Sequence, residues 1–137
     1  MTDNDLVSVR YMVDDVQEAV DFYSGVFGFE VRMSAAPAFA DVVRGHLRLL
    51  LSGPKSSAGR PMPDGRQPEA GGWNRIHFVV DDIDAEVERL HAAGVSFRND
   101  VVSGPGGKQI LIDDPSGNPI EIFQPAEAAT PAIVRQP

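Results

Sequence analysis

The sequence predicts an α+β protein built from two consecutive βαβββ modules. Residues 8–15 and residues 75–82 each read as an alternating strand that ends in an Asp-Asp pair, and an apolar residue follows each pair, Val16 or Ile83. Each strand then runs into apolar residues spaced three and four apart, which is typical of an amphipathic helix. Because the same plan occurs twice, we expect any function to reside where the two copies face each other.

The composition narrows the class of protein. The chain has 137 residues, 42% of them hydrophobic, which is enough for one compact domain or for two fused half-domains with a shared core. A net charge of −8 argues against binding to nucleic acid or to anionic membranes. No apolar run reaches the roughly 20 residues of a membrane span, and no secretory leader is visible, so we expect a cytoplasmic protein. The absence of cysteine excludes disulfide and thiolate chemistry.

The first module is expected over residues 6–51. In its first strand, residues 6–13, alternation places Ser8, Arg10 and Met12 on one face and the valines with Tyr11 on the other. A helix should follow, capped by Asp15 with Glu18 three residues later. The buried face of this helix is predicted to consist of Val16, Val20, Tyr23 and Phe27. Gly25 and Gly28 are predicted to end the helix.

Three further strands complete this module. They are expected at 29–33, 38–43 and 47–51, with a hairpin turn at Arg44-Gly45. The stretch from residue 52 to residue 74 then breaks every pattern, because it is rich in proline and glycine and contains three basic residues. A loop of this length without secondary structure is typical of a linker, a lid or an arm that embraces a partner.

The second module is expected over residues 75–124. Asp82 should cap its helix, Ile83, Val87 and Leu90 should form the buried stripe, and Ala93-Gly94 should end it. A strand should begin at 95–97, and two more should occupy 108–113 and 120–123, separated by a tight turn at 114–118. Residues 125–137 are small, polar and rich in proline, so we expect a disordered tail.

These elements resemble the vicinal oxygen chelate superfamily, which comprises glyoxalases, bleomycin resistance proteins and extradiol dioxygenases. The resemblance rests on the two Val-Asp-Asp strand ends, on Phe22-Tyr23 with Phe27-Gly28-Phe29, on Ala93-Gly94-Val95, and on Asp114-Pro115-Ser116-Gly117-Asn118-Pro119-Ile120-Glu121. It covers about residues 7–124. It implies mixed, curled sheets that form an open cup, and a homodimer whose sites are often shared between subunits.

Metal-dependent members of the superfamily hold one divalent ion with four inward His, Glu or Gln side chains. Here the corresponding first-strand positions are Ser8 and Arg75, the fourth-strand position of the first module falls within Leu49–Leu51, and only Glu121 could be a ligand. A guanidinium stays protonated and repels a cation. We therefore predict no metal and no other cofactor. The alternative is one divalent ion held by His77 and Glu121 with a ligand from elsewhere.

Arg75 and Glu121 form the natural pair of opposite charges, and we hypothesise that they bind each other, so that the guanidinium replaces the ion. The other possibility is a solvated Arg75 at the rim. His77 shares the face of Arg75 and could be an ion ligand, a general base, a hydrogen-bond donor to a bound molecule or a structural residue. His46 and His91 should lie on the surface, and no catalytic triad or other catalytic residue is visible.

The predicted ligand site combines polar and aromatic side chains. Aromatic walls suit flat conjugated ligands; Phe39 and Phe123 could instead pack in the core, and Trp73 could cover a pocket or anchor a dimer. The predicted ligand-binding residues are Ser8, Arg10, Met12, Phe39, Leu49, Leu51, Trp73, Arg75, His77, Glu121 and Phe123.

Three functions are compatible with this set. The favoured one is a metal-free protein that sequesters a hydrophobic or aromatic small molecule, as drug-resistance proteins of the superfamily do. The alternatives are a metal-dependent lyase, isomerase or extradiol-dioxygenase-like enzyme, and a dimeric module without a small-molecule role.

Overall fold

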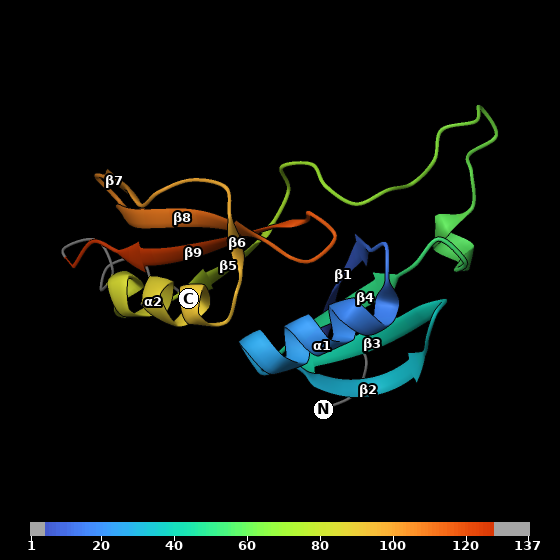
Figure 1. Ribbon diagram of the computed structural model, residues 1–137, viewed down its shortest axis with the longest axis horizontal. Coiled ribbons are helices and arrows are strands. Elements are labelled where there is room, and N and C mark those ends of the chain that lie inside the picture. The colour runs from blue at the N-terminus through green and yellow to red at the C-terminus, as the bar shows by residue number, and fades with distance from the viewer. Residues whose placement is uncertain (1–4, 128–137) are drawn as a thin grey trace. The chain divides into compact units, whose positions relative to one another are not determined.

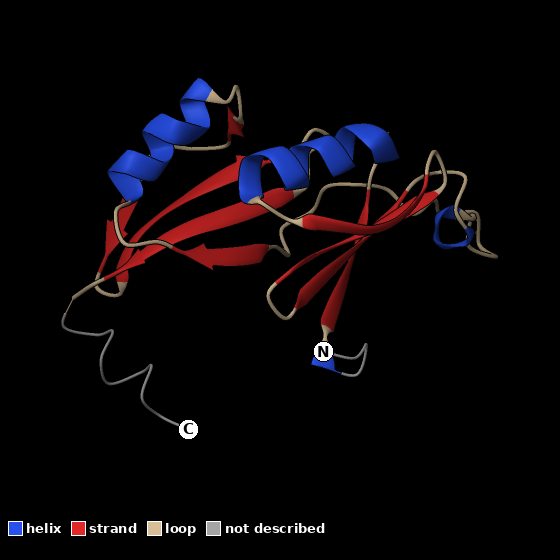
Figure 2. Ribbon diagram, turned by 90° about the horizontal axis from the view of Figure 1, so that it is seen from below, coloured by secondary structure: helices blue, strands red, loops and turns tan. Residues whose placement is uncertain are grey.

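The computed structural model describes residues 5–127, which form two compact units (Figure 1). Unit 1 comprises the chain up to Gly72 together with Pro115–Asn118, and unit 2 comprises Trp73–Asp114 and the chain from Pro119 onward. Each unit packs one α-helix against one face of a mixed sheet (Figure 2). The predicted α+β class and its two βαβββ modules are therefore confirmed. The cup that the two sheets should enclose stays a prediction.

Unit 1 contains four strands in the spatial order β1-β4-β3-β2. The β1–β4 pair is parallel, and the other two pairs are antiparallel. A turn at Gly45-His46 joins β3 to β4, one residue later than predicted. The elements are β1 (Val7–Met12), α1 (Val16–Phe27), β2 (Glu30–Ala35), β3 (Phe39–Arg44) and β4 (Leu47–Ser52).

Unit 2 repeats this order with β5-β9-β8-β6, and an additional short strand, β7, also pairs with β8. The expected second strand of this module is therefore broken into two pieces. At the break, Arg98 N donates to Leu111 O at 2.9 Å, and Leu111 N donates to the Asn99 side chain at 2.9 Å. The elements are β5 (Ile76–Val79), α2 (Ile83–Ala92), β6 (Ser96–Phe97), β7 (Val102–Gly104), β8 (Gly107–Asp113) and β9 (Pro119–Pro125).

Helix α1 begins and ends as the sequence predicts, with one exception. Asp15 accepts a hydrogen bond from Glu18 N at 3.0 Å, and Gly28 ends the helix in the left-handed conformation at φ 70°. The predicted stripe is buried throughout: Val16, Val20, Tyr23 and Phe27. Gly25 was expected to help stop the helix, and this was wrong, because the helix continues through it to Phe27.

Helix α2 is capped by Asp82, which accepts from Ala85 N at 3.1 Å. Ile83 and Leu90 are buried, as predicted, whereas Val87 is only half-buried. On its exposed side, the side-chain hydrogen bond to Glu86 raises the pKa of Arg89. The two α-helices have 12 and 10 residues, and within residues 5–127 no helix is long and apolar enough to cross a lipid bilayer.

The segment from residue 52 to residue 74 is more ordered than predicted. It contains a 3₁₀-helix, η2 (Ser57–Gly59), which Ser56 caps. The Gln67 side chain donates to Gly59 O at 2.6 Å, and Met62 N donates to Arg66 O at 2.8 Å. The loop therefore contains a 3₁₀-helix and internal hydrogen bonds, so the expectation of a stretch without secondary structure was wrong.

The expected tail is only partly described. Strand β9 extends to Pro125, beyond the predicted end of the second module. Residues 128–137, which make up most of the expected tail, and residues 1–4 lie outside the described part of the chain.

Candidate functional site: the far faces of the two sheets

Each sheet has one face covered by its own helix and one face turned away from that helix, called the far face below (Figure 2). On unit 1, the strand register brings together on the far face four of the predicted site residues: Ser8, Arg10, Met12 and Phe39. One row across the far face reads Arg10, Leu50, Asp41 and Met33. The alternation predicted for the first strand thus places its polar residues correctly.

The predicted roles of Leu49 and Leu51 were wrong. Both side chains are 0% exposed, and their cross-strand partners include the buried Val42 and Ala40. They therefore belong to the core beneath α1. The leucine of this run that lies on the far face is Leu50, which pairs with Arg10 just as Glu121 pairs with His77 in unit 2. Leu50 offers no metal ligand.

Three polar contacts organise the far face of unit 1. Arg48 Nε donates to Ser8 Oγ at 2.9 Å, and Arg48 Nη1 lies 3.8 Å from Asp41 Oδ2. Arg10 Nη1 donates to Ser52 Oγ at 2.8 Å. Asp41 is 8% exposed, and its Oδ1 has no hydrogen-bond partner among the residues that the structure describes.

On unit 2, Glu121 lies at the centre of the polar contacts. Its Oε1 accepts from Arg75 Nε at 3.0 Å and from Arg75 Nη2 at 2.9 Å, and its Oε2 lies 3.3 Å from His77 Nε2. The hypothesis that Arg75 and Glu121 bind each other is therefore confirmed. The His77 ring also contacts Phe123, with 5.0 Å between ring centroids. His46 and His91 are exposed, as predicted.

Trp73 lies at the start of unit 2 and is 71% exposed. The Arg98 guanidinium lies 5.0 Å from the centroid of its ring, a cation–π geometry, and Arg98 Nε donates to Asp113 at 2.6 Å. Arg75 Nη1 also donates to Trp73 O at 3.2 Å. Guanidinium groups thus hold both the indole ring and its backbone, while most of the ring stays in solvent.

The donor set does not fit a catalytic metal centre. Such centres for zinc or iron normally use three protein ligands. Within residues 5–127, no group of three or more His, Cys, Asp or Glu side chains could hold an ion. Glu121 and His77 are adjacent, but Arg75 holds Glu121 Oε1 with two hydrogen bonds. A cation at Glu121 would therefore have to displace a permanent positive charge.

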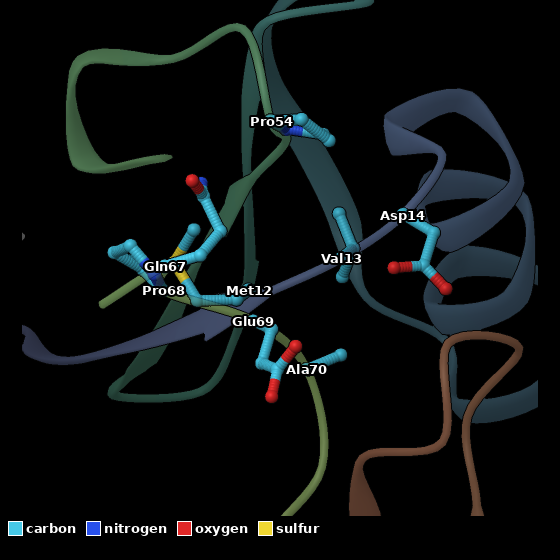
Figure 3. Close-up of a pocket in the computed structure, with 8 residues that line it drawn as sticks. All are labelled: Met12, Val13, Asp14, Pro54, Gln67, Pro68, Glu69 and Ala70. Carbon is cyan, nitrogen blue, oxygen red and sulfur yellow. The ribbon is translucent and has the colours of Figure 1, made fainter. Parts of the chain in front are cut away.

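A cavity of about 410 Å³ lies in unit 1 beside the end of β1 (Figure 3). Its carboxylates come from Asp14 and Glu69, and of the predicted site residues only Met12 reaches it. A smaller cavity of about 210 Å³ shares Asp14 and Pro54 with it. The larger cavity is lined by Met12, Val13, Asp14, Pro54, Gln67, Pro68, Glu69 and Ala70.

Several far-face residues were not among the predicted ligand-binding residues, namely Asp41, Arg48, Leu50, Ser52, Arg98 and Asp113. In β4, five apolar or long side chains in succession hide the alternation, so the face of each residue could not be assigned. The parallel register with β1 resolves it, because Arg48, Leu50 and Ser52 lie opposite Ser8, Arg10 and Met12. The polar Arg48 and Ser52, two residues to either side of Leu50, were the signal available in the sequence.

Comparison with known proteins places these features in context. Residues 5–122 match the family model described as the Glyoxalase/Bleomycin resistance protein/Dioxygenase superfamily. The uncharacterized protein YaeR of Escherichia coli K12 is 30% identical over 119 residues, which cover 85% of this chain and 92% of YaeR.

Two solved structures show how varied the similar proteins are. A lactoylglutathione lyase from Agrobacterium tumefaciens has a TM-score of 0.69 at 25% identity, and the match covers 87% of this chain and 92% of the lyase. TnmS3, an antibiotic binding protein from Streptomyces sp. CB03234, has a TM-score of 0.64 at 26% identity, and the match covers 88% of this chain and 95% of TnmS3.

Proposed function

This chain belongs to the glyoxalase/bleomycin resistance protein/dioxygenase superfamily, and from that premise we propose that it is a metal-free binding protein that sequesters a hydrophobic or aromatic small molecule. On each unit, the surface proposed to bind the molecule is the far face of its own sheet. The description of TnmS3 as an antibiotic binding protein supports this class of function. The second copy of the chain that the sequence suggests as a partner stays a prediction, which the molecular mass in solution would test.

The state of Glu121 is the observation that carries the proposal. Its side chain is 10% exposed, Arg75 donates two hydrogen bonds to its Oε1, and His77 Nε2 lies 3.3 Å from its Oε2. A carboxylate held in this way is a structural part of the far face and not a vacant ligand for a cation. The position that could have served metal chemistry instead presents the Arg75 guanidinium bound to Glu121, and the neighbouring His77 ring contacts Phe123.

Apolar side chains exposed on the far faces support a hydrophobic ligand. Val79 and Val102 of unit 2 are 63% and 49% exposed, and Met33 of unit 1 is 49% exposed. The register places Val79 opposite Phe123 and Val102 opposite Gln109, in one row across the sheet. The exposed apolar groups of this row lose their contact with water when a flat ligand covers them, which favours binding.

The alternative is a metal-dependent enzyme of the lyase or dioxygenase type. It is favoured by the 3.3 Å approach of His77 to Glu121 and by the similarity to a lactoylglutathione lyase. This alternative needs Arg75 to leave Glu121 and a third ligand to join.

Metal analysis and Trp73 fluorescence together test the proposal. Protein purified without chelators should hold far less than one zinc, iron, nickel or manganese ion per chain, and adding these ions should not raise its melting temperature. Polycyclic aromatic compounds should quench the fluorescence of Trp73, the single tryptophan. Arg75→Met should weaken the binding of carbonyl-bearing compounds, whereas Arg66→Met, which removes the same charge from an exposed pair with Asp64, should not.

Two results would overturn the proposal. The first is a stoichiometric metal that is lost in both His77→Ala and Glu121→Gln, which would establish the enzyme alternative. The second is the absence of any fluorescence or melting response across a broad aromatic library.

A further inference from the structure

We infer that the bound molecule carries an anionic group, and that Arg10 on the far face of unit 1 recognises it. This inference rests on the proposed function and specifies its ligand class as an aromatic or polycyclic anion. Three observations lead to it: the pairing of the far-face arginines, the way in which Arg10 is held, and the residues that lie in its row.

The far-face arginines differ in their partners. Arg48, Arg75 and Arg98 each meet a carboxylate of their own sheet, namely Asp41, Glu121 and Asp113. Within residues 5–127, Arg10 has no carboxylate at ion-pair distance. With a net charge of −8, the chain has more acidic than basic side chains, so most arginines could find a carboxylate partner. A far-face guanidinium that has none can bind an anionic group of a ligand instead.

Ser52 holds Arg10 in place. Ser52 is 0% exposed, and its hydroxyl donates to Leu50 O at 3.3 Å while accepting from Arg10 Nη1 at 2.8 Å. The guanidinium has five N–H groups in a rigid fork, and this contact occupies one of them. The remaining edge can bind a carboxylate or a similar oxyanion with two parallel hydrogen bonds. A restrained fork loses less conformational entropy on binding than a freely moving side chain does.

The row that begins at Arg10 provides a surface for the rest of the ligand. Leu50 is half-buried next to Arg10, and Met33 at the far end is 49% exposed. With neighbouring strands about 4.8 Å apart, four strands span roughly 14 Å, which is enough for three fused rings. Phe39 and Met12 belong to the next row and add apolar contact beside it.

The carboxylates of the same face do not prevent anion binding at Arg10. Asp41 is 8% exposed and has Arg48 at 3.8 Å. Glu30 lies on β2, the edge strand opposite to β1, which places it roughly 14 Å away across the sheet. Asp14 and Glu69 line the cavity beside the end of β1 together with Met12, and neither carboxylate lies at ion-pair distance from Arg10.

Matched pairs of probes test this inference by calorimetry. The probes are the 2-carboxylates of anthraquinone and naphthalene and the 9-carboxylate of acridine, each compared with its neutral carboxamide. The wild-type protein should bind the best carboxylate roughly 10- to 100-fold more tightly than its carboxamide at low salt, the value of one charge-assisted contact. The advantage should shrink as sodium chloride is added, because salt screens an exposed ion pair.

Arg10→Met should remove the preference for the carboxylate and leave carboxamide affinity within about threefold. Arg10→Lys should keep part of the preference, because the charge remains and the fork is lost. Arg44→Met is the control, because it removes the same charge from the same sheet at a position of opposite parity. This variant should keep the full preference.

The possible failures are distinguishable. Equal binding of the two members of each pair by the wild-type protein would overturn the inference and leave the proposed function intact. An equal loss of both forms in Arg10→Met would assign Arg10 a merely structural role and would also overturn it. No binding of any probe would contradict the proposed function, and the inference would fall with it.

Discussion

Glu121 shows how a single carboxylate can organise one face of a sheet. Its side chain is 10% exposed, and both of its oxygens are engaged, one by Arg75 and the other by His77. A carboxylate this well buried depends on its partners, because burial without them would leave a charge that neither water nor protein stabilises. Its contribution to stability should therefore exceed that of an ordinary surface ion pair.

Glu121→Gln should lower the free energy of unfolding by about 1–3 kcal/mol, because the ion pair is lost while the shape is kept. Glu86→Gln is the matched control. Glu86 pairs with Arg89 at 2.6 Å on the exposed side of α2, and its loss should cost less than about 0.5 kcal/mol. Urea denaturation of the two variants measures the difference. Equal effects would mean that the Glu121 contacts are no stronger than a solvated pair.

The Arg75–Glu121 pair could be predicted from the sequence, because the resemblance to the superfamily assigns both residues, of opposite charge, to positions of its ion site. The faces of Leu49 and Leu51 could not be predicted in the same way. In β4 five long or apolar side chains, Leu47–Leu51, follow one another, so Arg48 and Ser52 give only a weak indication of which face each leucine takes. Only the pairing with β1 shows that Leu50 faces away from the helix, and register is a tertiary property.

At the scale of elements, the helices follow local signals closely and the loop does not. Asp15 and Asp82 both cap their helices as predicted, since an N-cap depends on the next three residues alone. Residues 52–74 depend instead on bonds that span several residues, such as the one that the Gln67 side chain donates to Gly59 O, eight positions away. Composition predicts a loop there but not its internal order.

The two glycines of α1 make a test of this local reasoning. Gly25 lies inside the helix with no atom within 4 Å of an added Cβ, so Gly25→Ala should stabilise the protein by about 0.5–1 kcal/mol. Gly28 has φ +70°, so Gly28→Ala should destabilise it by about 1 kcal/mol although space is available. Thermal unfolding of both variants provides the measurement. Effects of the same sign would contradict the assigned end of the helix.

At the scale of the whole molecule, the division into units departs from the division into modules. The turn Pro115–Asn118 belongs to unit 1, although the strands that it joins, β8 and β9, belong to unit 2. Asn118 is 4% exposed, donates to Met12 O at 2.8 Å and accepts from Gly71 N at 2.8 Å. The tight turn was predicted from its sequence, but its partners were not, because they lie 106 and 47 positions away.

Asn118→Ala should lower the free energy of unfolding by about 2 kcal/mol, because two hydrogen bonds of a buried amide are lost together. Ser116→Ala removes the bond that its hydroxyl accepts from Asp14 N at 2.9 Å and should cost about half as much. Hydrogen exchange should show that amides of β1 open sooner in Asn118→Ala, and chemical denaturation gives the energies. A loss below about 0.5 kcal/mol would show that water replaces the amide without penalty.

Because Pro115–Asn118 belongs to unit 1, the two halves of the chain should not fold fully when they are expressed separately. Cutting the coding sequence between its two similar halves would leave the first product without Pro115–Asn118, which belong to its compact unit. The second product would carry these residues without the groups that they contact in unit 1. Each fragment would therefore be incomplete in a different way. Mixing the two fragments should restore more folded protein than either yields separately, because the first half needs residues that the second half carries.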